Sequence, residues 1–187
     1  LGSTVTLMDG RNLRARVLIG CDGRSSQVAT RAGIDRSGWK YNQTALVCAI
    51  SHKQPHNGVA HQFFTPSGPL AILPLPNNKC SIVWTEAASR AKHINVMDDA
   101  EYLKALTPFI GDFLGKIELV GDRFSYPLSL SLAENFVLDR IALVGDAAHG
   151  IHPLAGQGLN LGLKDIATLT EVLAIAQRRG EDIGARP

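Results

Sequence analysis

Short apolar runs, separated by turn-forming residues, fill the middle of the chain from about residue 44 to residue 132. Proline, glycine and asparagine punctuate these runs, a pattern typical of an antiparallel sheet. Within the same region, residues 98–114 carry apolar side chains every three or four positions, which predicts a single helix. The predicted strands are Ala45–Ile50, Ala60–Thr65, Ala71–Leu75, Cys80–Thr85 and Phe124–Leu130.

Two further apolar runs, Val17–Gly20 and Arg140–Val144, lie outside this region, and each leads into a turn with a glycine and a carboxylate. The first run predicts a strand buried on both faces, and the second predicts a further strand of the same layer. A short helix is predicted over 27–32 after the first run, and a long helix after the second, ending at Gly180. The two strands predict one nucleotide-binding layer, split around the β-rich insertion. The long helix carries one apolar face, formed by Leu159, Leu163, Ile166, Leu173 and Ala176.

The turn after the second strand offers two kinds of binding group. Asp146 provides a carboxylate, which suits the hydroxyls of a ribose or a ribitol chain. The following segment, Gly156 to Asn160, begins a helix, whose unpaired N–H groups and positive dipole end attract electron-rich or anionic groups. Together, the carboxylate can bind a polyol and the positive helix end can bind an electron-accepting ring. This combination fits a flavin better than it fits a simple phosphate.

Two segments carry a resemblance to a known family. The first is Gly145-Asp146-Ala147-Ala148-His149, continued by Pro153, Gly156, Gly158 and Asn160. This pattern resembles the second FAD fingerprint of the single-component FAD-dependent aromatic hydroxylases, which are flavoprotein monooxygenases. The second is Val-Leu-Ile-Gly-Cys-Asp-Gly-Arg-Ser-Ser over residues 17–26. It resembles the Asp-Gly motif of that family, which lies where the flavin and the reducing nicotinamide approach each other.

Within the family, the chain is most similar to the ubiquinone-biosynthesis ring hydroxylases. Segments 38–45, 63–75 and 81–84 carry this closer resemblance, which therefore extends over nearly the whole chain. One position departs from the family pattern. Many members have an arginine three residues after the serine of the Asp-Gly motif, where this chain has Ala29, with Arg31 two residues later. The departure bears on how nicotinamide docks and leaves the flavin prediction intact.

The resemblance implies an α/β fold, α+β overall, in which a Rossmann-like FAD-binding layer is split around an inserted, mainly antiparallel β-sheet substrate domain. The expected parts are a partial FAD-binding domain over 1–37, the substrate domain over 38–132, and the rest of the FAD-binding domain over 133–187. Family members begin with a strand, a G-x-G-x-x-G turn and a helix that binds the ADP half of FAD. This sequence has no such turn, so we interpret the chain, which runs from Leu1 to Pro187, as a fragment that is inactive alone.

The implied cofactor is FAD, with NAD(P)H as electron donor. In such enzymes the reduced flavin and dioxygen form a peroxide at flavin C4a, which attacks an electron-rich ring. No side chain is assigned as a catalytic acid, base or nucleophile. The residues predicted to bind the cofactor are Asp22, Gly145, Asp146, Pro153, Gly156, Gln157, Gly158, Leu159 and Asn160.

The implied substrate is a polyprenylated phenol. Phe64, Leu73 and Pro74 are predicted to line its cavity, although ordinary strand packing would also explain them. The family further suggests contacts with other ubiquinone-biosynthesis proteins and peripheral attachment to a membrane. The expected location is the bacterial cytoplasm, at the inner membrane, or the matrix side in mitochondria. Two alternatives stay open: a hydroxylase of a small soluble phenol, and a non-catalytic subunit that binds prenylated intermediates.

Composition excludes several other functions. The net charge of +2 and the isoelectric point near 8.5 are mild, and the scattered basic residues predict no nucleic-acid surface. No apolar run is long enough to cross a bilayer. His149 and His152 have the spacing of a ligand pair, but no third ligand suits them, so no metal site is predicted. The three cysteines, at positions 21, 48 and 80, are predicted to be buried thiols.

Overall fold

The computed structural model describes residues 2–184, which form two compact units. One unit contains the chain up to Trp39 together with the chain from Ser129 onward, and the other contains Lys40–Leu128. The sequence places the domain boundaries after residues 37 and 132. The interpretation of the two chain ends rests on Leu1, Arg186 and Pro187, which lie outside the described residues.

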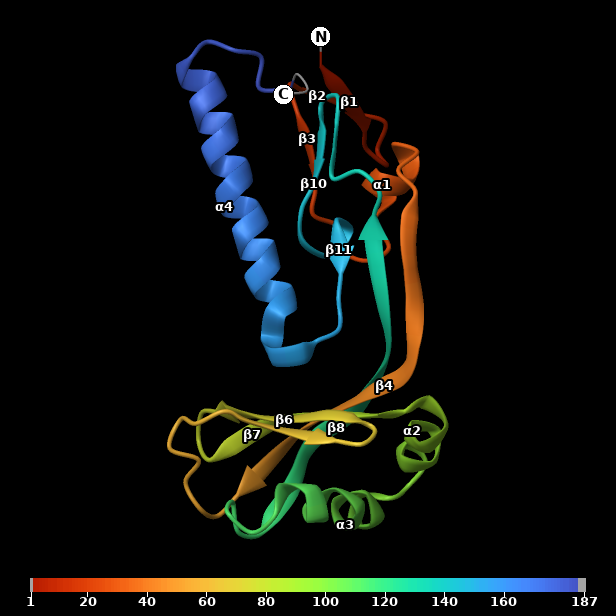
Figure 1. Cartoon of the computed structure of the whole chain (residues 1–187), viewed down its shortest axis with the longest axis vertical. Coiled ribbons are helices and arrows are strands. Elements are labelled where there is room, and N and C mark those ends of the chain that lie inside the picture. Colours follow the sequence, from red (N-terminus) through yellow and green to blue (C-terminus); the bar gives the residue numbers. More distant parts are fainter. Residues whose placement is uncertain (1, 185–187) are drawn as a thin grey trace. The chain divides into compact units, whose positions relative to one another are not determined.

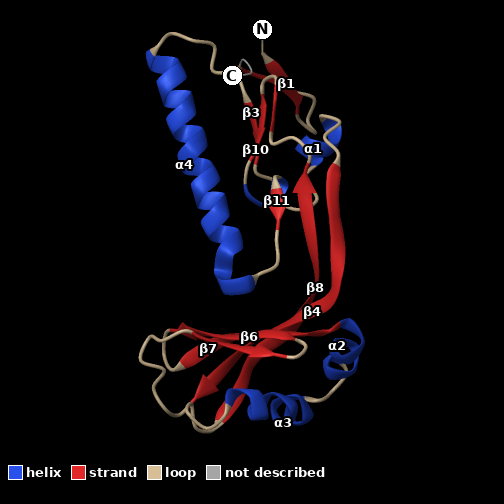
Figure 2. Cartoon of the chain, viewed as in Figure 1, coloured by secondary structure: helices blue, strands red, loops and turns tan. Residues whose placement is uncertain are grey.

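The unit Lys40–Leu128 is built on an antiparallel sheet (Figure 2). Its strands follow the spatial order β8-β4-β7-β6-β5. Strands β4 and β8 also contribute residues to the other unit, where β8 pairs with the short β11 (His149–Gly150). The strands are β4 (Arg36–His52), β5 (His61–Thr65), β6 (Gly68–Leu75), β7 (Lys79–Ala87) and β8 (Ile117–Ala133).

Helices α2 (Ala88–Asn95) and α3 (Asp99–Ile110) cover one face of this sheet (Figure 1). Asp98 and Glu101 form a capping box at the start of α3, which satisfies two backbone N–H groups. Successive side chains of a strand point to opposite faces of the sheet, so every second strand residue packs against the helices. The buried core is Leu46, Cys48, Ile50, Leu70, Ile72, Cys80, Ile82, Trp84, Ala91, Ile94, Tyr102, Leu106, Ile110 and Leu114.

The other unit combines small sheets with one long helix. Strands β1 (Ser3–Thr6) and β2 (Asn12–Ala15) form a hairpin. In a second sheet, β10 is parallel to β3 and antiparallel to β9. The two parallel strands, β3 and β10, are the two that the sequence predicts for the nucleotide-binding layer. The remaining elements are β3 (Leu18–Gly20), α1 (Gln27–Arg31), β9 (Val137–Leu138), β10 (Ile141–Leu143), the 3-10 turns η1 (Gly145–Ala147) and η2 (Leu154–Gly156), β11 (His149–Gly150) and α4 (Gln157–Arg178).

Several predicted elements differ from the observed ones. The helix predicted over 98–114 ends at Ile110, because Gly111 adopts a positive φ of 75°. Helix α2 was not predicted. The first nucleotide-layer strand is not buried on both faces, since Ile19 is 40% exposed. Of the predicted apolar face of α4, Leu173 and Ala176 line a groove, whereas three residues are exposed: Leu159, Leu163 and Ile166.

Candidate cofactor site

A tight turn after β10 presents Asp146. Gly145 adopts a left-handed conformation, with φ of 62°, which starts the 3-10 turn η1. Ala147 and Ala148 are fully buried behind the turn, and the Ala148 N–H donates to the Gly145 carbonyl. The Val144 N–H donates to the Gly20 carbonyl, which ties this turn to the strand before the Asp-Gly motif. The turn therefore buries the two alanines that follow Asp146, whereas the Asp146 side chain is 41% exposed.

Two arginines hold this turn from residues earlier in the chain. The Arg24 Nε donates to the Asp146 Oδ2 over 2.9 Å, and the other Arg24 nitrogens donate to two backbone carbonyls. Arg36, at the start of β4, donates to the carbonyls of Ala147 and Asp146 and to Ser131. The Asp146 and Ala147 carbonyls lie in the 3-10 turn η1 and the Ile151 carbonyl follows β11, so the guanidinium groups provide donors to backbone acceptors around this turn.

A carboxylate on α4 also binds the turn. The Asp165 Oδ2 accepts the Gly145 N–H at 2.9 Å and lies 2.6 Å from the His149 Nε2. An ionised carboxylate only accepts hydrogen bonds, so the Nε2 of His149 carries the proton. The His149 ring is buried, stacks at a tilt on Phe136, and its Nδ1 has no hydrogen-bond partner among the described residues. Asp165 thus joins α4 to both ends of the turn that carries Asp146.

The start of α4 lacks a side-chain cap. Ala155 and Gly156 adopt left-handed conformations, with φ of 50° and 66°, so the chain reverses sharply into the helix. At Gly156 and Gly158 an added Cβ would meet no atom within 4 Å. Gln157, Leu159 and Asn160 are exposed, as is Pro153 before the turn. The Gln157 N–H donates to the Leu154 carbonyl, and no side chain of the described residues caps the start of this 22-residue helix, which makes the segment able to receive an electron-rich group.

Asp22 is engaged within its own motif. Its Oδ1 accepts the Ser26 hydroxyl at 2.6 Å, and its Oδ2 accepts the N–H groups of Gln27 and Val28. Partial burial raises the pKa of the Asp22 carboxyl, but the hydrogen bonds from Ser26 and from these two amides outweigh it and hold that pKa below its usual value. Asp22 thus stabilises the first turn of α1, and its contact with a cofactor stays a prediction.

The predicted substrate-cavity residues lie in the other unit, Lys40–Leu128. Leu73 and Phe64 are both exposed, Phe64 by 77%. The strand register places both on the sheet face opposite Trp84, whereas Pro74 is on the face of Ile72 and the core. Trp84 is fully buried and forms part of the core. The cavity role of Phe64, Leu73 and Pro74 stays a prediction.

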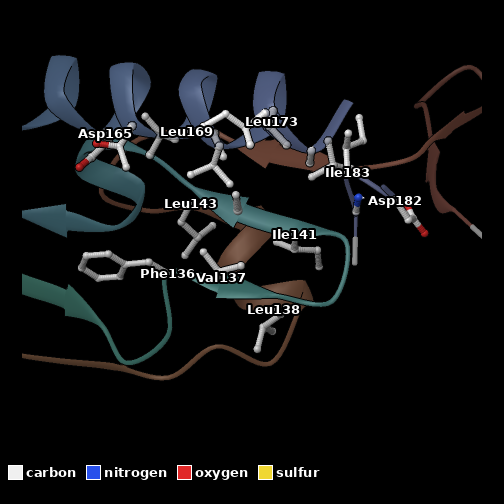
Figure 3. A pocket seen from close by; sticks show the side chains of 18 of the residues that line it. Phe136, Val137, Leu138, Ile141, Leu143, Asp165, Leu169, Leu173, Asp182 and Ile183 are labelled. Atoms are coloured by element: carbon white, nitrogen blue, oxygen red, sulfur yellow. Dashed lines mark hydrogen bonds between the residues drawn. The ribbon is translucent and has the colours of Figure 1, made fainter. Parts of the chain in front are cut away.

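An apolar groove of about 670 Å³ lies between α4 and the β9–β10 pair. In Figure 3, Leu169 and Leu173 of α4 point across the groove toward Leu143 and Ile141 of β10. Asp165 is at one end of it and Asp182 near the other. None of the residues predicted to bind FAD lines this groove, so the groove and the predicted cofactor site are separate places.

Other predictions concern metals, membranes and thiols. Within residues 2–184, no cluster of three or more His, Cys, Asp and Glu side chains has a metal-binding arrangement. Over the same range, no helix has both the length and the apolar character needed to span a bilayer. The prediction of three buried thiols is wrong for Cys21, which is exposed because the strand ends at Gly20. Cys48 and Cys80 are buried.

Sequence reasoning did not find the groups that support Asp146. Arg24 and Arg36 act from positions more than a hundred residues away, so no local pattern indicates the contact. The sequence did contain a signal that could have identified Asp165 as a supporting residue. It shares a helical face with Leu169, Val172 and Ala176, and a carboxylate on an otherwise apolar face usually has a specific partner.

Comparisons with known proteins show similarity over nearly the whole chain. A family model described as "FAD binding domain" matches residues 4–183. Ubiquinone hydroxylase UbiL of Rhodospirillum rubrum is 48% identical over 184 residues, which cover 98% of this chain and 43% of that protein. The 3-demethoxyubiquinol 3-hydroxylase of Escherichia coli is 37% identical, with 97% of this chain and 46% of that protein covered.

The fold also matches a solved structure. A crystal structure of Pseudomonas aeruginosa PqsL in complex with 2-aminobenzoylacetate superposes with a TM-score of 0.76 at 25% identity, over 94% of this chain and 50% of that one. These matches confirm the predicted fold class and the resemblance to ubiquinone ring hydroxylases. The chain spans less than half the length of the two relatives named above.

Proposed function

Because the chain belongs to the FAD binding domain family, we propose that it is part of a monooxygenase that hydroxylates the aromatic ring of a polyprenylated phenol in ubiquinone biosynthesis. The observation that carries the proposal is the half-exposed carboxylate of Asp146 on a turn that leads into the uncapped start of α4. The names of the relatives from Rhodospirillum rubrum and Escherichia coli support the choice of substrate class.

The residues present fit the isoalloxazine and ribitol parts of FAD. Open space surrounds the positions that a Cβ would occupy at Gly156 and Gly158, which allows a flat ring to approach the backbone. The Oδ1 of Asp146 accepts no hydrogen bond from the described residues, so it is available to a ribitol hydroxyl. Gly145 and Pro153 shape the two turns, and Gln157, Leu159 and Asn160 surround the helix start.

When bound, FAD supplies the activation of dioxygen, with NAD(P)H as the expected source of electrons. The N–H groups at the start of α4 would stabilise negative charge on the bound ring, through both hydrogen bonding and the helix dipole. Asp146 orients the cofactor through its ribitol chain, and Asp22 keeps the neighbouring motif in place through α1.

The substrate is proposed to be apolar at one end and phenolic at the other. Phe64 and Leu73, with their exposed apolar surface on one sheet face, are candidates to contact the ring or the first prenyl units, and Pro74 shapes the same strand. Apolar walls also exclude water from the reacting groups. The prenyl tail further favours attachment of the complete protein to a membrane surface and contact with other enzymes that handle the same insoluble intermediates.

The test is a substrate comparison with the complete protein, reconstituted with FAD and NAD(P)H. The assay measures hydroxylated product by mass spectrometry for a phenol with a prenyl chain and for the same phenol without it. The proposal predicts product from the prenylated phenol and little from the bare one. The reverse preference would indicate a hydroxylase of small phenols. Binding of prenylated phenol without any product would indicate a non-catalytic subunit.

A further inference from the structure

Arg24 makes a three-way set of hydrogen bonds around Asp146. Its Nε donates to the Asp146 Oδ2 at 2.9 Å, its Nη1 to the Ser129 carbonyl at 3.2 Å, and its Nη2 to the Ile151 carbonyl at 2.5 Å. The guanidinium is planar, so three bonds to three separate segments fix its orientation. That orientation in turn fixes the Asp146 Oδ2, whereas the Oδ1 accepts no hydrogen bond from the described residues.

Gly150 provides the space that this arrangement needs. A Cβ at Gly150 would lie 3.1 Å from both Cγ and Nε of Arg24, which is closer than nine in ten real Cβ contacts, so the Arg24 side chain would have to shift. Gly150 is buried, and its φ lies outside the positive range, so an alanine is compatible with the backbone there. The fit between Gly150 and Arg24 therefore concerns the position of the Arg24 side chain rather than the shape of the chain.

We propose that Arg24 is a positioning residue for Asp146, which holds one carboxylate oxygen so that the other accepts a hydroxyl of the cofactor. This inference rests on the proposed function, because it assumes that Asp146 binds FAD. Arg24 and Asp146 are 37% and 41% exposed, so water screens their attraction, and the ion pair itself adds little to stability. The value of the contact lies in orientation, because a carboxylate held in advance loses less conformational freedom when the cofactor binds.

The experiment measures the dissociation constant of FAD for the complete protein, from which FAD has first been removed. The variants are Arg24→Gln, Arg24→Lys, Gly150→Ala, Asp146→Ala and two doubles, Arg24→Gln with Gly150→Ala and Arg24→Gln with Asp146→Ala. Arg11→Gln is the matched control, because Arg11 forms a local, exposed ion pair with Asp9 in the same unit. Circular dichroism melting checks that each variant is folded.

We expect Arg24→Gln to weaken FAD binding about fivefold, Arg24→Lys about twofold, and the control not at all. Gly150→Ala should weaken binding in the native background but add nothing when Arg24 is already Gln. Arg24→Gln should likewise add nothing to Asp146→Ala. A purely structural role would give additive losses and a lower melting temperature.

The negative results are distinguishable. If Asp146→Ala weakens FAD binding while Arg24→Gln binds within experimental error of the native protein, the positioning role is overturned and the proposed function stands. If Asp146→Ala leaves FAD affinity unchanged, the cofactor assignment itself fails. Additive losses in the Arg24 and Gly150 double variant would also overturn the positioning role, because they would show that Gly150 acts independently of Arg24.

Discussion

Removing the Asp165 carboxylate should loosen the turn that carries Asp146. The Asp165 Oδ2 is the acceptor for both the Gly145 N–H and the His149 Nε2, at 2.9 and 2.6 Å. Hydrogen bonds to a charged group contribute about 1.5–3 kcal/mol each. The Asp165 side chain is 25% exposed, so water partly replaces it, and we expect Asp165→Ala to cost about 3 kcal/mol of local stability.

Native-state hydrogen exchange of the complete protein measures this cost where it arises. A loss of about 3 kcal/mol corresponds to roughly 100-fold faster exchange in the peptide that contains Gly145, under conditions in which exchange follows the opening equilibrium. Asp165→Asn keeps an acceptor oxygen but not the charge, so it should give about half the loss in kcal/mol. A peptide from β7 should exchange at the native rate in both variants.

The control variant is Glu171→Ala, which removes an exposed carboxylate from the same helix. Surface substitutions of this kind usually change stability by about 0.5 kcal/mol or less. If Asp165→Ala accelerates exchange near Gly145 by less than about threefold, or no more than Glu171→Ala does, then Asp165 does not hold the turn.

Three further predictions follow from single contacts. Gly158→Ala should raise the melting temperature of the cofactor-free protein slightly, since alanine favours a helix by about 1 kcal/mol, yet weaken FAD binding by crowding the open helix start; tighter binding would contradict the assignment. Gly38→Ala should prevent stable folding, measured by soluble yield and circular dichroism, because its Cβ would clash with the Leu130 carbonyl; native yield would refute this contact. The hydrogen bond from Arg140, with a lesser one from a backbone amide, lowers the pKa of Asp182 to about 2. The ionised Asp182 carboxylate therefore stabilises the fold above about pH 4, and this stabilisation is lost as the pH falls toward 2. Unfolding measured as a function of pH should show the loss in the native protein and less of it in Arg140→Gln.

Local features of the sequence predict much of the chain. The strands of the inserted sheet and the two turns with Asp22 and Asp146 all depend on near neighbours: alternating side chains, turn residues and a helix start. Helix α2 escaped prediction because only two of its residues, Ala91 and Ile94, are buried, which gives no clear helical period.

The support of the candidate site could not be predicted in the same way. Arg24, Arg36 and Asp165 reach the turn after β10 through contacts that depend on the whole fold, and each contact joins residues 16 or more positions apart. The environment of Cys21 also depends on where a strand ends, which sequence patterns place only within a few residues.

The most direct test of the account is the flavin content of the complete protein with Asp146→Ala, measured as the ratio of flavin to protein absorbance together with hydroxylation of a prenylated phenol. The account predicts that the variant folds, loses most of its FAD and forms little product, because no other described carboxylate lies on the Gly145 turn to replace Asp146. Native flavin content with native hydroxylation would contradict it.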